Sequence, residues 1–234
     1  MAATSGRART VTIGLGALLG VLMLYFAVPR TVAAVLLMPG DRPLHVIQNG
    51  LLPPTREIEA IISSRTAATH WIEQGRLLTD RSLARLTLAE QAAKDAEPDP
   101  AKLEEAAHDL VAGLSLEPVN PHAWARLAYI RFLQRGLSTD AGVAPALRLS
   151  FLTGPYEPEM TFPRLRLALA VWSNFSTEDR ELGRRQIRFA WLLSRDEVVD
   201  LAIQSQRILV FRLALVSQPQ DLAIFDSMLK ERSG

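Results

Sequence analysis

Histidine and acidic side chains are the groups in this sequence that could do chemistry, but their spacing matches no complete site. The four histidines are His45, His70, His108 and His122, and no two of them stand at metal-ligand spacing on one predicted helix. Glu105 and His108 form a single Glu-x2-His pair, whereas a di-iron bundle needs two such pairs and two further inward glutamates. The chain has no cysteine, which removes thiolate metal sites and thiol catalysis. We therefore expect no metal and no cofactor.

The sequence lacks the motifs of the common enzyme classes. The patterns G-x-S-x-G, H-E-x-x-H, Walker A and G-x-G-x-x-G do not occur. A glycan- or lipid-modifying enzyme would need a cluster of buried acids, and the sequence shows none. These observations predict that the protein is not an enzyme.

Four arginines occupy neighbouring positions of one predicted helix: Arg180, Arg184, Arg185 and Arg188. Such a row could bind phosphate, an acidic sugar or an anionic lipid headgroup. Glu178, Asp179 and Glu181 lie close by, so pairing within the helix could instead leave an ordinary solvated face. Both interpretations remain open from the sequence.

The charge balance disfavours a nucleic-acid partner. Residues 1–40 hold three arginines and no acid, so the rest of the chain has 23 basic residues (26 minus three) against 25 acidic ones. Binding to a nucleic-acid backbone needs a pronounced basic face, which such a balance does not supply. We expect protein or membrane partners and no nucleic acid.

An apolar segment near the N-terminus predicts a membrane anchor. Residues 11–29 carry no charge, which is about the ~20 residues that cross a bilayer, and a second apolar run extends from 31 to 38. Pro39 and Gly40 are expected to end this helix. We thus predict a short tail over 1–10, a transmembrane anchor over 11–38 and a proline-rich linker over 39–54.

The segment favours a retained anchor over a cleaved signal peptide, because it exceeds the usual apolar length of a signal and no A-x-A site follows it. Arginines flank it on both sides, so charge counting alone gives a near tie for orientation. The short N-terminal stub favours a cytoplasmic N-terminus with the body in the periplasm. Because the basic residues are almost all arginine, a pattern typical of a GC-rich bacterial genome, we expect a single pass through a bacterial inner membrane.

The body over 55–234 is predicted to be all-α, because proline and glycine punctuate helix-length amphipathic segments and strand patterns are nearly absent. Asp99-Pro100 and Asn120-Pro121 are helix-start signals. The expected helices cover about 55–78, 80–95, a segment from 100 that buries Leu103 to Leu114, a segment from 121, 143–153, 160–173, 177–194, 196–216 and 219–231. The run from Ile208 to Val216 is apolar almost all round, which indicates a buried helix or a docking surface.

Part of this body resembles a tetratricopeptide repeat. Trp124-x2-Leu127-Ala128 is similar to the opening of that repeat, and two closing patterns stand 40 residues apart, with the surplus placed in Gln134–Ala144. The expected repeat-packing residues are Ala106, Leu110, Gly113, Pro118, Trp124, Leu127, Ala128, Ala146 and Pro158. The resemblance implies an array of antiparallel helical hairpins with small residues at close helix contacts and prolines ending the second helices. It also implies a concave groove for a peptide or protein segment.

Taken together, these features predict a membrane-anchored, non-enzymatic scaffold with a TPR-like body. Its layout is similar to that of small accessory proteins of bacterial envelope and exopolysaccharide synthesis or export, which suggests such partners. The alternative is an accessory structural subunit of a larger bioenergetic or transport complex in the inner membrane.

Overall fold

The computed structural model describes residues 3–94, 96–135 and 142–233, and these residues form helices without any strand. In chain order the elements are α1 (Ala3–Gln48), α2 (Thr55–Thr69), α3 (Gly75–Ala93), α4 (Pro100–Leu116), α5 (Pro121–Arg135), α6 (Val143–Thr153), α7 (Pro158–Ala170), the 3-10 turn η2 (Trp172–Asn174), α8 (Thr177–Leu193), α9 (Arg195–Gln204), α10 (Ile208–Leu215) and α11 (Pro219–Ser233). The all-α prediction, with one long apolar N-terminal helix before a packed helical body, is confirmed.

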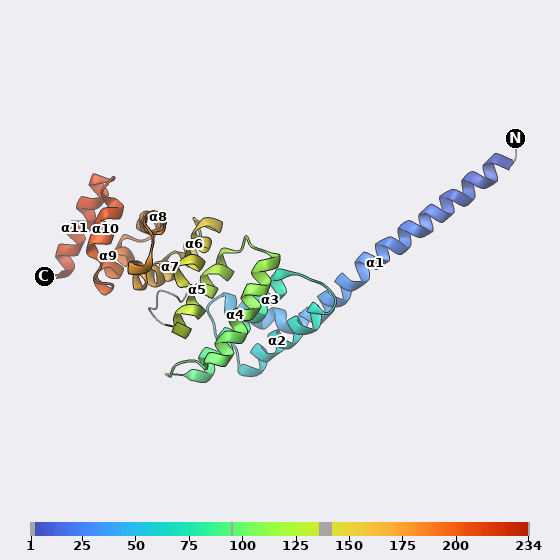
Figure 1. Ribbon diagram of the computed structural model, residues 1–234, viewed down its shortest axis with the longest axis horizontal. Coiled ribbons are helices and arrows are strands. Elements are labelled where there is room, and N and C mark those ends of the chain that lie inside the picture. The colour runs from blue at the N-terminus through green and yellow to red at the C-terminus, as the bar shows by residue number, and fades with distance from the viewer. Residues whose placement is uncertain (1–2, 95, 136–141, 234) are drawn as a thin grey trace.

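Helices that follow one another along the chain pack side by side as antiparallel pairs. The most extensive contacts join α1 with α2, α3 with α4, and α5 with α6. Alternate helices also touch, so that α1, α3, α5 and α7 form a row. Figure 1 shows the pairs stacked in order from the end of α1 to the C-terminus, while most of α1 projects away from the stack. The arrangement is compatible with a helical repeat fold.

The first helix does not end at Pro39-Gly40, as the sequence predicted, but continues through Pro39 and Pro43 to Gln48. A proline inside a helix costs about 3 kcal/mol, so other contacts must stabilise this stretch. Ala33, Gly40 and Leu44 are buried there against α2 and α3. The loop between α1 and α2 is therefore only residues 49–54, and the helix expected as the anchor is also the first helix of the body.

Two other segments that the sequence predicts as one helix each are interrupted in the structure, and a second helix begins after the break. The helix expected over 55–78 ends at Thr69, and α3 starts at Gly75, not near Asp80. The segment expected as one helix over 196–216 breaks at residues 205–207, where Gln206 has a positive φ of 55°. In both places the chain reverses so that the next helix packs back on the stack. Neither break contains a proline or a glycine, so the local sequence does not predict that the helix ends there.

Helix starts were predicted well where a capping side chain marks them. The Asp99 carboxylate accepts a hydrogen bond from the Ala101 backbone N–H at 2.9 Å, and the Asn120 carbonyl oxygen accepts one from Ala123 at 3.0 Å. The helix over 143–153 has the expected bounds. A cap satisfies otherwise unpaired N–H groups of the first turn, so its effect is local.

The expected repeat-packing residues divide by burial. Six of them are buried in the helix contacts: Ala106, Leu110, Gly113, Leu127, Ala128 and Ala146. Trp124 is partly buried and donates its indole N–H to the Pro118 carbonyl at 2.8 Å. Pro118 and Pro158 are exposed, and Pro158 is the first residue of α7 and does not end α6, which corrects the role expected for it. Part of the surplus loop, residues 136–141, lies outside the described residues.

A closely packed point joins α3 to α4. A Cβ added to Gly113 would lie 2.8 Å from the Gly75 carbonyl oxygen and 2.8 Å from Thr79 Cγ2. Only glycine allows the two backbones to come this close. This tight contact sets the position of α3 relative to α4, and α3 in turn forms one wall of a groove on the surface of the body.

Candidate binding groove

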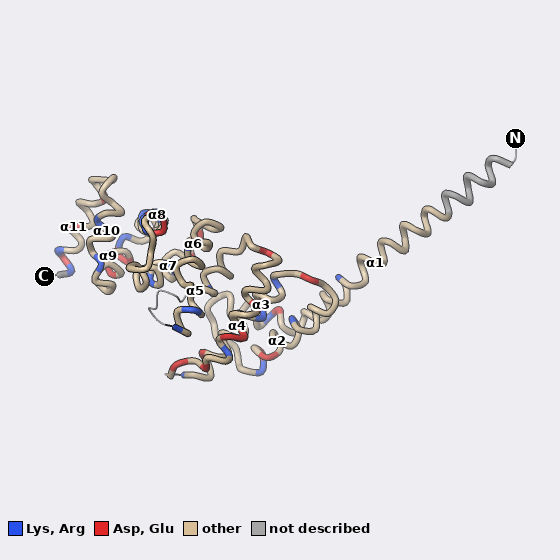
Figure 2. Tube along the Cα trace, in the orientation of Figure 1, with Lys and Arg blue, Asp and Glu red and all other residues tan. Residues whose placement is uncertain are grey.

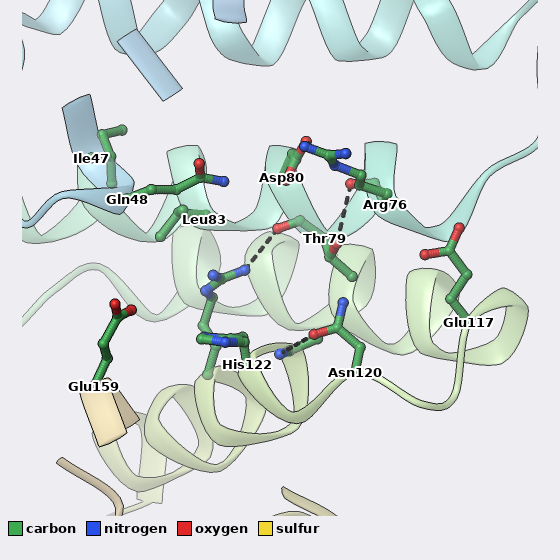
Figure 3. Close-up of a pocket in the computed structure, with 12 residues that line it drawn as sticks. Ile47, Gln48, Arg76, Thr79, Asp80, Leu83, Glu117, Asn120, His122 and Glu159 are labelled. Atoms are coloured by element: carbon green, nitrogen blue, oxygen red, sulfur yellow. Dashed lines mark hydrogen bonds and ion pairs between the residues drawn. The ribbon is translucent and has the colours of Figure 1, made fainter. Parts of the chain in front are cut away.

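A concave cavity of about 600 Å³ lies on the row of alternate helices (Figure 3). Its walls are α3 and α5, with the last residues of α1 at one side and the first turn of α7 below them. The lining side chains are Ile47, Gln48, Arg76, Thr79, Asp80, Leu83, Glu117, Asn120, His122, Ala123, Arg126 and Glu159. The groove thus draws residues from four helices and the α4–α5 loop.

Asp80 is the most buried acid of the groove, with a relative exposure of 9%. Burial raises the pKa of its carboxyl, because removal from water disfavours the charged form, and the nearby guanidinium groups of Arg65 and Arg76 oppose that shift. The carboxylate lies 3.9 Å from Arg65 and 3.7 Å from Arg76. These long ion pairs leave Asp80 able to accept a hydrogen bond from a bound group.

Arg126 reaches across the groove from α5 to α3. Its Nη1 donates to the Thr79 carbonyl at 2.8 Å, one of the interactions drawn in Figure 3. Burial lowers the pKa of Arg126 to about 10, and the negative charge of Asp80 counteracts this. The guanidinium remains charged at neutral pH, so it places a fixed positive charge at the floor of the groove.

Several polar side chains at the rim make no hydrogen bond or ion pair within the part of the chain that the structure describes. Among the described residues, no hydrogen bond or ion pair engages the side chains of Gln48, Glu117 or Glu159. Figure 3 shows Gln48 and Glu159 toward one end of the groove and Glu117 at the other. His122 lies between them, and partial burial lowers its pKa, which favours the neutral imidazole. The rim therefore offers both donors and acceptors to a ligand.

A second cavity of about 390 Å³ continues the groove toward α1. The two share Gln48, Arg76 and Asp80. Behind them Arg65, which is 3% exposed, donates to the Leu37 carbonyl at 3.1 Å and to the Asp41 carboxylate at 2.7 Å. Arg65 thereby ties α2 to the last turns of α1 and closes this end of the groove.

The polar side chains of the groove could recognise a bound chain through hydrogen bonds and ion pairs. The lining combines acids, guanidinium groups, amides and an imidazole, so it can both donate hydrogen bonds to a bound chain and accept them from it. Within the described part of the chain, no three His, Asp or Glu side chains are grouped to hold a metal ion.

The four arginines expected as an anion patch do share one side of α8, and the structure shows what engages them. Glu181 lies 2.9 Å from Arg184, 3.0 Å from Arg188 and 3.8 Å from Arg185. Hydrogen bonds from Arg188 and Arg184 lower the pKa of Glu181. The intrahelical pairing considered from the sequence is thus present for three of the four. One carboxylate does not neutralise three guanidinium groups, so anion binding stays a prediction.

The groove residues Arg65, Asp80 and Arg126 were not picked out from the sequence. A signal for two of them exists in the apolar stripes of their helices. Ile58, Ile61 and Arg65 recur at helical spacing on the buried side of α2, and Leu77, Asp80 and Ala84 do so on α3. A charged residue within a buried stripe indicates a paired or functional group.

The membrane segment is the other candidate site. Helix α1 from Gly14 to Gln48 is long and apolar enough to cross a membrane, and its apolar window is almost wholly unburied by the rest of the chain. Figure 2 shows no acidic or basic residue along the projecting, described part of α1 until a basic one close to the body. The predicted single span is therefore present as a candidate by length and composition.

Comparisons with known proteins return no relative. No protein-family model matches the chain, and no curated protein and no solved structure matches it either.

Proposed function

We propose that this protein is a membrane-anchored, non-enzymatic scaffold that binds a segment of a partner protein in the groove along α1, α3, α5 and α7. The observation that supports the proposal most is the set of rim side chains, Gln48, Glu117 and Glu159, that make no hydrogen bond or ion pair with any residue that the structure describes, above the buried Asp80 and the Arg126 guanidinium. Polar groups placed over a concave surface fix the register of an extended chain through hydrogen bonds. Because α1 is continuous with the groove wall, a partner bound there is held near the membrane.

The partners that we propose are proteins of envelope polysaccharide synthesis or export, in a bacterial inner membrane with the body in the periplasm. This rests on the layout of a short anchor followed by a helical array and on the resemblance of Trp124-x2-Leu127-Ala128 to a tetratricopeptide repeat. Glycosyltransferase, polymerase or exporter subunits would then be the proteins recovered from the groove.

Photo-crosslinking from the groove tests the proposal. A photoreactive amino acid is placed at Glu117 or Glu159, at the two ends of the groove, in the full chain in its native membrane. A matched control places it at Lys102, an exposed residue of α4 outside the groove lining. We expect a protein adduct from both groove positions and none from Lys102. Equal adducts from all three positions, or none, would contradict groove binding.

A second candidate function is supported by apolar side chains on the C-terminal helices. Leu192 is 75% exposed, Leu209 67% and Val216 61%, so one side of α10 and the end of α8 face outward. The sequence offered a buried helix or a docking surface over 208–216, and the structure buries only part of it: Phe211, Ala214 and Leu215. An accessory subunit of a larger complex would cover this surface permanently.

Gentle detergent extraction separates the two functions. A subunit should co-purify in fixed stoichiometry with one complex, and photo-crosslinks from position 209 should reach that complex. A scaffold should be recovered with substoichiometric partners that crosslink from Glu117. Stoichiometric recovery with adducts only from position 209 would replace the scaffold proposal by the subunit.

A further inference from the structure

The loop between α2 and α3 lies beside the part of α1 that carries exposed aromatic residues. Trp71, Ile72, Glu73 and Gln74 line one cavity of about 300 Å³ together with Tyr25, Phe26, Pro29 and Arg30 of α1. These two segments are far apart in the sequence. At this loop the body therefore reaches the side of the projecting helix.

Beyond this level one side of α1 becomes buried by the body, while Val35 and Met38 on the other side stay exposed. Leu22, Leu24 and Phe26 are between 52% and 62% exposed, whereas Ala33 is fully buried by the body. The first charged residue after the apolar stretch is Arg30, whose Nη1 donates to the Phe26 carbonyl at 2.9 Å. If α1 crosses a bilayer, the hydrocarbon core must lie on the N-terminal side of Arg30, because a guanidinium favours the headgroup region.

Three exposed aromatic side chains gather at that boundary. Tyr25 is 72% exposed, Phe26 53% and Trp71 48%, and no hydrogen bond engages the Trp71 indole N–H among the described residues. Tryptophan and tyrosine concentrate at membrane interfaces, where the ring lies in apolar surroundings and the polar atom meets water or headgroups. Trp71 lies beside Phe26 and Pro29 with about half of its surface open, so a bilayer surface at the level of the loop would give the ring that environment.

We propose that the α2–α3 loop, His70–Gln74, rests in the headgroup layer of the bilayer that α1 crosses, with the Trp71 ring at the boundary of the hydrocarbon. The proposal rests on α1 being a membrane span, as in the proposed function. The loop contact and the helix together give the body two attachments to the bilayer. The groove then has a fixed height and direction relative to the membrane surface and does not swing on a single stalk.

Spin labels test this placement, and the lack of cysteine makes every single-cysteine variant unique. The full chain is reconstituted alone in phosphatidylcholine nanodiscs with a label at Glu73→Cys. The matched control is Glu97→Cys, in the loop at the opposite end of α3, and both residues are exposed. We expect the label at 73 to be relaxed more by oxygen, which partitions into lipid, than by a water-soluble nickel reagent. The label at 97 should show the reverse.

A second measurement uses the native Trp71. Lipids brominated near the headgroup end of the acyl chain should quench part of the tryptophan fluorescence, and the Trp71→Phe variant should lose that quenched part. The Trp124→Phe variant, which removes a tryptophan of α5, should keep it.

The outcomes separate the two levels of the argument. If the chain is washed from membranes by alkaline carbonate, α1 is no span, and both the anchor and the loop contact are wrong. If the chain stays integral but the label at 73 is as accessible to nickel as the label at 97, the loop contact alone is wrong.

Discussion

Single charged side chains within apolar helix stripes decide how neighbouring helices meet. Arg164 is 2% exposed, and within the described residues no ion pair joins its guanidinium to a carboxylate, although the charge of Glu157 acts on it from a distance. Its Nη1 donates to the Gly154 carbonyl at 2.7 Å and to the Ser150 carbonyl at 3.1 Å, and its Nη2 donates to the Gln186 side chain at 2.8 Å. Burial lowers its pKa to about 10. Arg164 thus caps the C-terminal end of α6 and links it to α8, because cations are favoured at that end of a helix.

Replacing Arg164 by leucine should destabilise the fold strongly. The Arg164→Leu variant leaves the Gly154 carbonyl and the Gln186 amide without a donor, and buried unsatisfied groups cost about 1–3 kcal/mol each. We expect the free energy of unfolding to fall by ~2–4 kcal/mol. Circular dichroism of the protein in detergent measures this unfolding. Arg166→Leu is the control, because Arg166 is half-exposed and its ion pair with Glu197 is worth less than ~1 kcal/mol. Equal losses in the two variants would refute the capping role.

The stability of the fold should depend on pH through the Asp80 carboxyl. Burial raises the pKa of this carboxyl in the folded chain above its unfolded value, which is near 3.8. The protonated carboxyl therefore stabilises the fold at pH values below the unfolded pKa. This stabilisation is lost as the pH rises through the folded pKa. Ionised Asp80 therefore opposes folding at neutral pH. Asp80→Asn should raise the melting temperature at pH 7, and its advantage should disappear below about pH 4. A lower melting temperature at pH 7 would show that the pairs with Arg65 and Arg76 outweigh burial.

At the scale of elements, the continuity of α1 with the body rests on a close contact at Gly40. A Cβ at this position would lie 2.5 Å from Arg65 Nη1 and 2.9 Å from the Ile61 Cα of α2. The contact lets α1 and α2 bury Leu44, Ile58 and Ile61 between them. Helix pairing and not helix propensity holds residues 39–48 in the helix, since Pro39 and Pro43 would otherwise interrupt it.

A valine at position 40 should separate α1 from α2. Gly40→Val must displace backbone atoms of α2, and overpacking of this kind costs about 1–3 kcal/mol. We expect a lower melting temperature and greater protease cleavage in the loop over 49–54. Gly20→Val is the matched control, because a Cβ at Gly20 meets nothing within 4 Å. Unchanged melting of the Gly40 variant would mean that the contact does not support the fold.

At the scale of the whole molecule, the last part of α1 belongs to the packed body as well as to the helix that holds the candidate membrane span. Residues 33–48 are part of the first helix pair, and Ala33, Leu44 and Arg65 are buried through it. A fragment that begins after α1 exposes the apolar side of α2. The groove would lose one wall in the same step, because Ile47 and Gln48 line it.

Two truncations test this. The fragment over 31–234 should be soluble and melt cooperatively, whereas the fragment over 49–234 should melt lower or aggregate. Exposing Ile58 and Ile61 alone costs about 1.5–3 kcal/mol per side chain. Size-exclusion chromatography and circular dichroism of the two fragments compare them directly. Equal stability would contradict the assignment of residues 33–48 to the body.

The sequence by itself determined the features that local physics controls. The all-α class, the apolar N-terminal helix, the starts of α4 and α5 at Asp99 and Asn120, and the bounds of α6 all follow from composition, periodicity and capping. Each of these signals acts over one helix turn or one uninterrupted apolar run, so it can be detected without knowing what packs against it.

Only the tertiary structure decided the features that depend on contacts between distant segments. The passage of α1 through Pro39 and Pro43 requires α2, and the break after Thr69 places α3 against Gly113 of α4. The groove exists because alternate helices, each separated from the next by one intervening helix in the sequence, bring Asp80 of α3 and Arg126 of α5 to one surface. Such juxtapositions follow from burial of the helix stripes against one another, which no local pattern encodes.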